Sequence, residues 1–175
     1  MSSDTKIGVE IEKKYIIEKP SFDILAAMPS YTVSDILQIY LTSERGQTRR
    51  IRRRSYKDKI HFYETTKIRI DRISSTEMER EISEAEFLRL SELMRKDSHP
   101  IHKTRHTFIY KEQLFEIDIY PQWRSTAILE TELETRDTTV EFPPFIKVVR
   151  DLTGNKNYSN ASMAKKFPDE ETSHL

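Results

Sequence analysis

Cysteine is absent from this 175-residue sequence, which excludes disulfide bonds and metal sites built on thiolates. Long apolar runs are missing as well, since no stretch approaches the roughly 20 residues that a membrane-spanning helix requires. Only 3 glycines occur, while 33% of the residues are charged, so many charges must lie on regular secondary structure. The N-terminus shows no secretion signal, and we expect a cytoplasmic protein that does not bind membranes.

A net charge of one sign is also lacking. The 29 lysines and arginines balance 29 aspartates and glutamates, so no overall field draws the protein to nucleic acid or to an anionic membrane. Any site for a polyanion must therefore be local. The length favours a single domain, which we place at residues 1–167, followed by a flexible tail at residues 168–175.

Alternation of apolar and polar residues with a period of two predicts about eight strands, joined by short links and therefore mostly antiparallel. The strands are expected near residues 7–17, 34–42, 47–55, 59–70, 76–82, 102–110, 113–120 and 126–135. Helical patterns are expected just after Pro20, from Ser83 with Glu86 in a capping box, from Pro143 to Leu152, and from Ser159 to Lys166. The pattern indicates a mostly β, α+β fold.

Charged residues share one face of several predicted strands, because an extended strand sends alternate side chains to opposite faces. The first such strand carries Glu10, Glu12 and Lys14 on one face. For a single strand, a solvated face is the simpler explanation. The pattern recurs in Glu77 and Glu79, Glu116 and Asp118, Glu130 and Glu132, Arg50 and Arg52, Lys67 and Arg69, and Lys103 and Arg105. Recurrence favours a barrel whose lumen is lined by charges and whose helices pack outside.

Taken in order, these residues resemble the CYTH superfamily, also called the triphosphate tunnel metalloenzymes. Glu10, Glu12 and Lys14 match the Glu-x-Glu-x-Lys near the N-terminus that marks the family. Further matches are Gln38-Ile-Tyr40-Leu41, Arg50-Ile-Arg52, Thr65-Thr-Lys67, Glu77-Met-Glu79, Lys103-Thr-Arg105, Glu116-Ile-Asp118, Glu130-Thr-Glu132 and the closing Leu152-Thr153-Gly154-Asn155-Lys156-Asn157-Tyr158. The resemblance implies a closed antiparallel barrel of eight strands that hydrolyses a triphosphate with Mg²⁺ or Mn²⁺.

The resemblance also implies roles for these residues, and their chemistry agrees, because Mg²⁺ and Mn²⁺ prefer oxygen ligands and Arg and Lys bind phosphate. The expected metal ligands are Glu10, Glu12, Asp118, Glu130 and Glu132. The expected phosphate-binding residues are Lys14, Arg50, Arg52, Lys67, Lys103, Arg105 and, since Asn157 stands where the family has arginine, Lys156. Catalytic roles are expected for Glu10, Glu12, Lys14, Lys67 and Arg105. Tunnel positions without an assigned role are expected for Glu77, Glu79 and Glu116.

Several functions stay open on the sequence. Hydrolysis of inorganic tripolyphosphate to pyrophosphate and phosphate is the first choice, because the chain is short and carries no appended recognition module. An adenylate cyclase and a thiamine or nucleoside triphosphatase are alternatives within the resemblance. A non-catalytic polyphosphate- or nucleic-acid-binding protein is an alternative from another class, suggested by the run Arg49–Arg54. The interspersed acidic strands argue against a continuous nucleic-acid surface, and association into a homodimer stays open.

Overall fold

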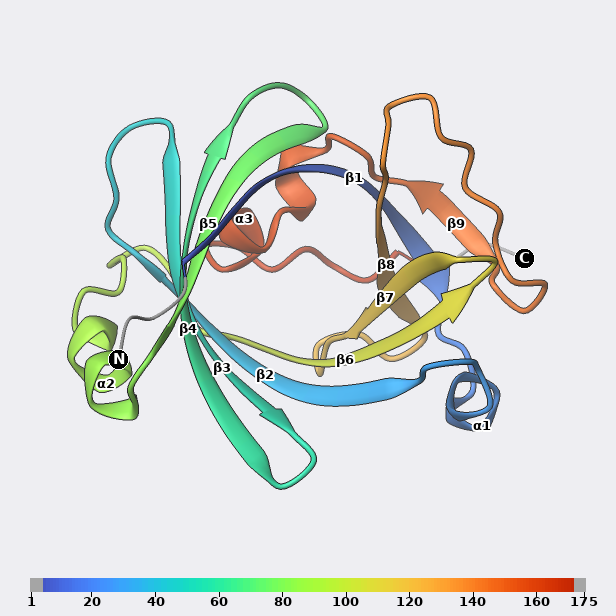
Figure 1. Cartoon of the computed structure of the whole chain (residues 1–175), viewed down its shortest axis with the longest axis horizontal. Helices are drawn as coiled ribbons and strands as arrows, with labels where there is room; N and C mark the ends of the chain where they lie inside the picture. The colour runs from blue at the N-terminus through green and yellow to red at the C-terminus, as the bar shows by residue number, and fades with distance from the viewer. Residues whose placement is uncertain (1–4, 172–175) are drawn as a thin grey trace.

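The structure is a computed structural model that describes residues 5–171 of the chain. Eight antiparallel strands form a closed barrel in the order β5-β4-β3-β2-β6-β7-β8-β1, and the β5–β1 pairing closes it (Figure 1). Their bounds are β1 (Lys6–Glu18), β2 (Thr32–Leu41), β3 (Gln47–Tyr56), β4 (Lys59–Arg69), β5 (Ser74–Ile82), β6 (Ile101–Tyr110), β7 (Gln113–Ile119) and β8 (Thr126–Glu132). The predicted eight-stranded barrel is confirmed.

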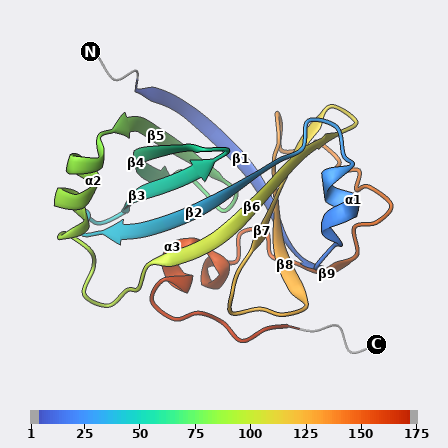
Figure 2. The ribbon, with the colours of Figure 1, turned by 90° about the horizontal axis from the view of Figure 1, so that it is seen from below.

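Two helices cover apolar clusters on the outer face of the barrel, α1 (Phe22–Ala26) and α2 (Glu84–Ser91). Leu25 of α1 packs with Phe108 and Phe115 of β6 and β7. Figure 2 shows α2 at the opposite side of the barrel from α1. The predicted cap of α2 is confirmed, because the Ser83 hydroxyl accepts a hydrogen bond from the backbone N–H of Glu86 at 3.1 Å. Such a cap stabilises a helix by about 1 kcal/mol.

The third helix, α3 (Asn160–Met163), packs against side chains that point into the barrel. Its cluster includes Ile16 of β1 and Ile128 of β8, which have the same parity as Lys14 and Glu130. The Tyr120 hydroxyl donates to Oδ1 of Asn160 at 2.8 Å, and Figure 2 shows α3 at one edge of the barrel, on the side of β6 away from β1. Whereas α1 and α2 lie outside, α3 therefore fills one end of the lumen with an apolar plug.

The segment predicted as a helix from Pro143 to Leu152 contains no helix, so this prediction is wrong. Its end forms a ninth strand, β9 (Val148–Asp151), which pairs with β1 at residues 15–17. Strand β5 pairs with β1 only as far as Ile11, which leaves the second half of that edge free. Strand β9 occupies it, and the backbone N–H of Leu152 donates to the carbonyl of Lys14 at 2.8 Å. Pairing across the sheet thus overrides the local helical spacing.

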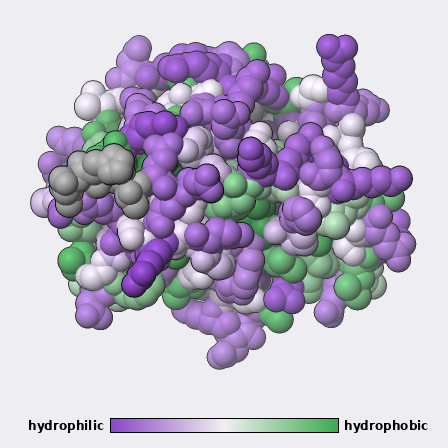
Figure 3. Space-filling model, turned by 180° about the vertical axis from the view of Figure 1, so that it is seen from behind, coloured by the Kyte–Doolittle hydropathy of each residue, from purple (hydrophilic) through white to green (hydrophobic). Residues whose placement is uncertain are grey.

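Up to residue 171, the C-terminal residues form hydrogen bonds with residues 123–126. The indole of Trp123 donates to the carbonyl of Pro168 at 3.0 Å, and Glu170 accepts from the backbone N–H groups of Arg124, Ser125 and Thr126. Residues 172–175 of the expected tail lie outside the described residues. Hydrophilic residues cover most of the face in Figure 3, with hydrophobic residues in smaller patches. Among residues 5–171, every helix is too short or too polar to cross a membrane.

Candidate functional site

A cavity of about 500 Å³ lies inside the barrel and is lined by charged side chains from seven of its strands. The predicted residues that line it are Glu10, Glu12, Lys14, Arg50, Arg52, Lys67, Glu77, Glu79, Arg105, Glu116, Glu130, Glu132 and Lys156. The inward row on β3 is Arg50 and Arg52, whereas Arg49 bonds Glu64 on the outer face, with 2.6 Å between Arg49 Nε and Glu64 Oε1. Strand parity thus brings residues that are distant in the sequence to one surface.

Two predicted site residues, Lys103 and Asp118, do not reach this surface. Both side chains are fully buried, and Lys103 Nζ lies 2.5 Å from Asp118 Oδ2. Arg105 donates to both oxygens of Asp118, through Nε at 2.7 Å and Nη2 at 2.8 Å. Burial alone would raise the pKa of Asp118, but Arg105 and Lys103 hold it below its usual value. Burial lowers the pKa of Lys103 to about 8. Asp118 does not line the cavity, and its carboxylate instead holds the guanidinium of Arg105 in place.

Glu130 faces the cavity but is already neutralised by neighbouring cations. Its carboxylate lies 2.8 Å from Lys14 Nζ and 3.2 Å from Arg105 Nη2. Burial alone would raise its pKa, yet Lys14 and Arg105 hold the pKa well below the usual range. Arg105 also pairs with Glu116 at 2.5 Å. Lys14, Arg105 and these carboxylates therefore form an ion-pair network at one side of the cavity, and Lys14 Nζ extends it to Glu12 at 3.9 Å.

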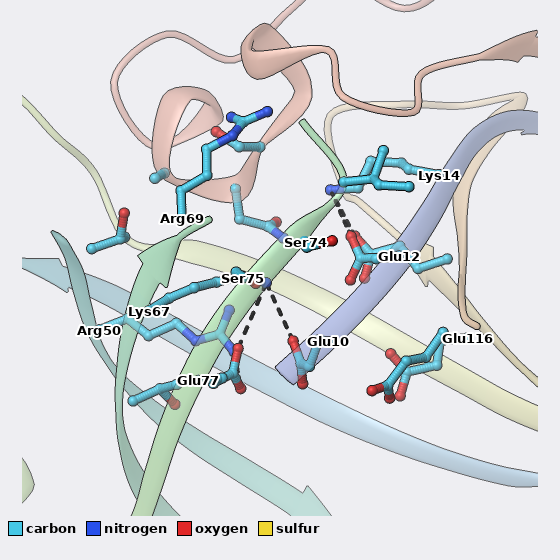
Figure 4. Close-up of a pocket in the computed structure, with 18 of the residues that line it drawn as sticks. Glu10, Glu12, Lys14, Arg50, Lys67, Arg69, Ser74, Ser75, Glu77 and Glu116 are labelled. Carbon is cyan, nitrogen blue, oxygen red and sulfur yellow. Dashed lines mark hydrogen bonds and ion pairs between the residues drawn. The ribbon is translucent and has the colours of Figure 1, made fainter. Parts of the chain in front are cut away.

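Three other carboxylates, Glu10, Glu12 and Glu132, form what we call the acidic wall (Figure 4 labels Glu10 and Glu12 on β1). Burial and the charge of Glu77 raise the pKa of Glu10 to about 7, against the attraction of Lys67. Burial and nearby carboxylates also raise the pKa values of Glu12 and Glu132. Lys67 Nζ is the closest cation to Glu10, at 3.4 Å. Burial and the mutual repulsion of these carboxylates therefore disfavour the charged forms of the acidic wall.

Three arginines of β3, Arg50, Arg52 and Arg54, form the opposite surface, which we call the cationic wall. Arg50 pairs with Glu77 at 3.5 Å, but its Nε is buried and has no hydrogen-bond partner among the described residues. Among residues 5–171, the guanidinium of Arg52 forms hydrogen bonds only with Gln38, at 3.4 Å, and burial together with Arg50 lowers its pKa to about 10. Each guanidinium has five N–H donors and these contacts occupy only some of them, so the cationic wall retains donors for an anion.

Two further cavity residues, Arg69 and Arg72, were not predicted as site residues. Arg69 has the parity of Lys67, and this signal was present in the sequence. Arg72 lies in the turn between β4 and β5, where strand parity predicts nothing. Within residues 5–171, no three carboxylate or histidine side chains converge closely enough, in the conformations described, to form a metal site.

Comparison with known proteins gives likenesses of structure only. No family model matches the sequence. No curated protein matches it either. The crystal structure of the inorganic triphosphatase NE1496 is similar with a TM-score of 0.58 and 22% identity, over 91% of this chain and 96% of that one.

Two archaeal structures are also similar to this chain. The PH1819 protein from Pyrococcus horikoshii OT3 has a TM-score of 0.55 and 22% identity, over 73% of this chain and 80% of that one. The PH1012 protein from the same organism has a TM-score of 0.53 and 17% identity, over 72% of this chain and 80% of that one. At these identities the likeness shows the fold alone.

Proposed function

We propose that this protein is a divalent-metal-dependent triphosphatase that hydrolyses inorganic tripolyphosphate to pyrophosphate and phosphate. The observation that carries the proposal is the division of one cavity into an acidic wall with raised pKa values and a cationic wall of three arginines. A phosphate chain that carries a metal ion presents positive charge to the first wall and negative oxygens to the second. The fold that the chain shares with the inorganic triphosphatase NE1496 agrees with this class of reaction.

The acidic wall fits Mg²⁺ or Mn²⁺ by the chemistry of its donors. Carboxylate oxygens are the ligands these ions prefer, and a cation would offset the burial and the repulsion that raise the pKa values of Glu10, Glu12 and Glu132. Glu130 and Asp118 leave the proposed ligand set, because buried lysines and arginines already neutralise them. The bound ion would supply Lewis-acid stabilisation of charge on the phosphate oxygens.

The chain's own cations would bind and orient the phosphates. Arg50 and Arg52 offer guanidinium donors whose planar arrangement matches phosphate oxygens. Lys67 contacts Glu10 at 3.4 Å and Glu77 at 3.6 Å, so its charge lies between the acidic and cationic walls. Arg105 is held in place by Asp118. Fixed charges of this kind catalyse phosphoryl transfer by positioning and electrostatic stabilisation, with little covalent chemistry from the protein.

The composition of the cavity favours an inorganic substrate over a nucleotide or thiamine triphosphate. Among the described residues that line it, Tyr40 is the sole aromatic. Tyr40 is buried, and its hydroxyl accepts a hydrogen bond from Gln38 at 2.7 Å. A nucleobase or a thiazolium ring therefore finds no exposed aromatic face for stacking.

The test is phosphate release from tripolyphosphate, measured with Mg²⁺, with Mn²⁺ and with EDTA. Glu10→Gln and Glu132→Gln should each lower metal-dependent turnover about tenfold or more, since each removes a charged ligand. Lys13→Gln is the matched control, because Lys13 neighbours Glu12 but points to the other face of β1 and should keep full activity.

Three results would contradict parts of the proposal. Undiminished turnover in both glutamine variants would refute the metal assignment. Faster turnover of ATP or thiamine triphosphate than of tripolyphosphate would refute the substrate. Binding of tripolyphosphate without phosphate release at any metal concentration would show a non-catalytic protein.

A further inference from the structure

Three cations line the cavity at the end that α3 fills, and the proposed reaction does not use them together. Arg69 ends β4, Arg72 lies in the turn that follows, and Lys156 begins the 3₁₀ turn Lys156–Tyr158. Figure 4 shows Arg69 on the side of Lys67 that faces the C-terminal segment. Within the described part of the chain, none of the three makes an ion pair with a carboxylate, unlike Lys14, Lys67 and Arg105.

Backbone carbonyls hold the two arginines without neutralising them. Arg69 donates from Nε to the carbonyl of Asp71 at 2.7 Å and from Nη2 to that of Arg72 at 2.8 Å. Arg72 donates from Nη1 to the carbonyl of Thr153 at 3.4 Å. A guanidinium has five N–H donors, so most donors of each arginine stay available. Both side chains are oriented by the protein and keep their full charge.

Gly154 allows Arg72 to lie across the C-terminal segment. Gly154 has a φ of +75°, and a Cβ there would lie only 2.4 Å from Cγ of Arg72. Any other residue would displace the arginine or the turn. The close approach brings Arg72, from the β4–β5 turn, to the segment that carries Lys156.

Asp71 also lines this end of the cavity, but its carboxylate is already bonded to other groups. Its Oδ1 accepts from the backbone N–H groups of Ile73 and Ser74, each at 3.0 Å. Its Oδ2 pairs with Arg136. The hydrogen bond from the backbone N–H of Ile73 lowers the pKa of Asp71 most strongly, and the bonds from Arg136 and Ser74 lower it further. This end of the cavity therefore keeps a net positive charge from Arg69, Arg72 and Lys156.

We propose that Arg69, Arg72 and Lys156 form a second anion subsite, which binds the phosphates beyond the third in a linear inorganic polyphosphate. This inference rests on the proposed function, since it extends the chain that the Arg50 and Lys67 region would hold. Lys67 and Arg69 are two residues apart on one face of β4, which separates them by about 7 Å along the strand. Both line the same cavity, so one extended polyanion can contact both.

The test compares tetrapolyphosphate with tripolyphosphate as substrates of the full-length protein and of Arg69→Gln/Arg72→Gln. The kcat/KM for tetrapolyphosphate should fall tenfold or more, and that for tripolyphosphate should change less than twofold. Arg53→Gln is the matched control, because Arg53 is an arginine of β3 that faces away from the cavity, and it should change neither value. Arg72→Gln alone, which loses one long hydrogen bond, should show a smaller effect of the same kind if the double variant does not fold.

Equal losses on both substrates, or no loss on either, would overturn the subsite. If the unaltered protein releases no phosphate from tripolyphosphate, the proposed function fails separately. Calorimetric titration with the two polyphosphates then tests the subsite alone, and the double variant should bind tetrapolyphosphate at least tenfold more weakly while its affinity for tripolyphosphate changes less than twofold. Unchanged affinity for tetrapolyphosphate would overturn the subsite in that case too.

Discussion

Asp118→Asn tests whether this carboxylate is structural rather than a metal ligand. The substitution keeps the shape of the side chain but leaves Lys103 and Arg105 without the charge that lies 2.5 and 2.7 Å from them. Asp118 and Lys103 have no solvent exposure. Removing one partner of a buried ion pair costs about 3–5 kcal/mol, because the remaining charge is uncompensated. For a protein of this size, that loss lowers the melting temperature by roughly 6–20 °C.

The assay is urea unfolding in EDTA, followed by the fluorescence of the single tryptophan, Trp123, whose side chain is buried. Glu10→Gln provides the contrast, since its pKa is raised by burial and by neighbouring carboxylates. Replacing Glu10 with a neutral side chain should not destabilise the metal-free protein. A loss below about 1 kcal/mol for Asp118→Asn, or equal losses in the two variants, would refute the distinction between a carboxylate stabilised by buried cations and one whose charge is disfavoured by burial.

Two further predictions concern stability. The pKa of Glu10 rises on folding from 4.5 to about 7, so the folded state binds more protons between these pH values and loses stability as the pH rises through them. Urea unfolding in EDTA should therefore show a larger loss of stability with rising pH for the unaltered protein than for Glu10→Gln. Identical pH profiles of the two proteins would contradict this prediction. Gly154→Ala should cost about 1 kcal/mol or more, because φ is +75° and the new Cβ meets Arg72, whereas Gly8→Ala, with open space around Cβ, should be nearly neutral in thermal unfolding.

Strand parity predicts the barrel and most of the cavity wall. Alternation is a property of the extended backbone itself, so the inward positions of Glu10, Arg50 and Glu130 follow from the sequence once one residue of each strand is known to face inward. All eight predicted strands are present, with ends shifted by at most three residues. The local signals for these strands agree with the pairing that the whole fold requires.

Strand parity does not predict how deep along the barrel axis a side chain lies. Asp118 has the same parity as Glu116 in β7, yet only Glu116 lines the cavity. The difference comes from the plug, since Tyr120 and Ile128 beside Asp118 pack against α3 and exclude solvent. Which end of a strand is plugged depends on contacts with distant residues, and no local pattern encodes them.

The long strand β1 also constrains the order in which the protein folds. Its first half pairs with β5, and its second half pairs with β8 and β9, whose residues follow Thr126 in the chain. Contacts so distant in sequence slow folding, because the intervening chain must be ordered first. During synthesis, β1 is made before β8, so the edges of its second half stay unpaired until β8 has been made. Strands β2, β3 and β4 instead pair with strands that are close in the sequence. The apolar side chains Ile7 and Val9 of β1 are exposed even in the finished barrel, so this strand presents apolar surface and free edges to other chains until β8 forms.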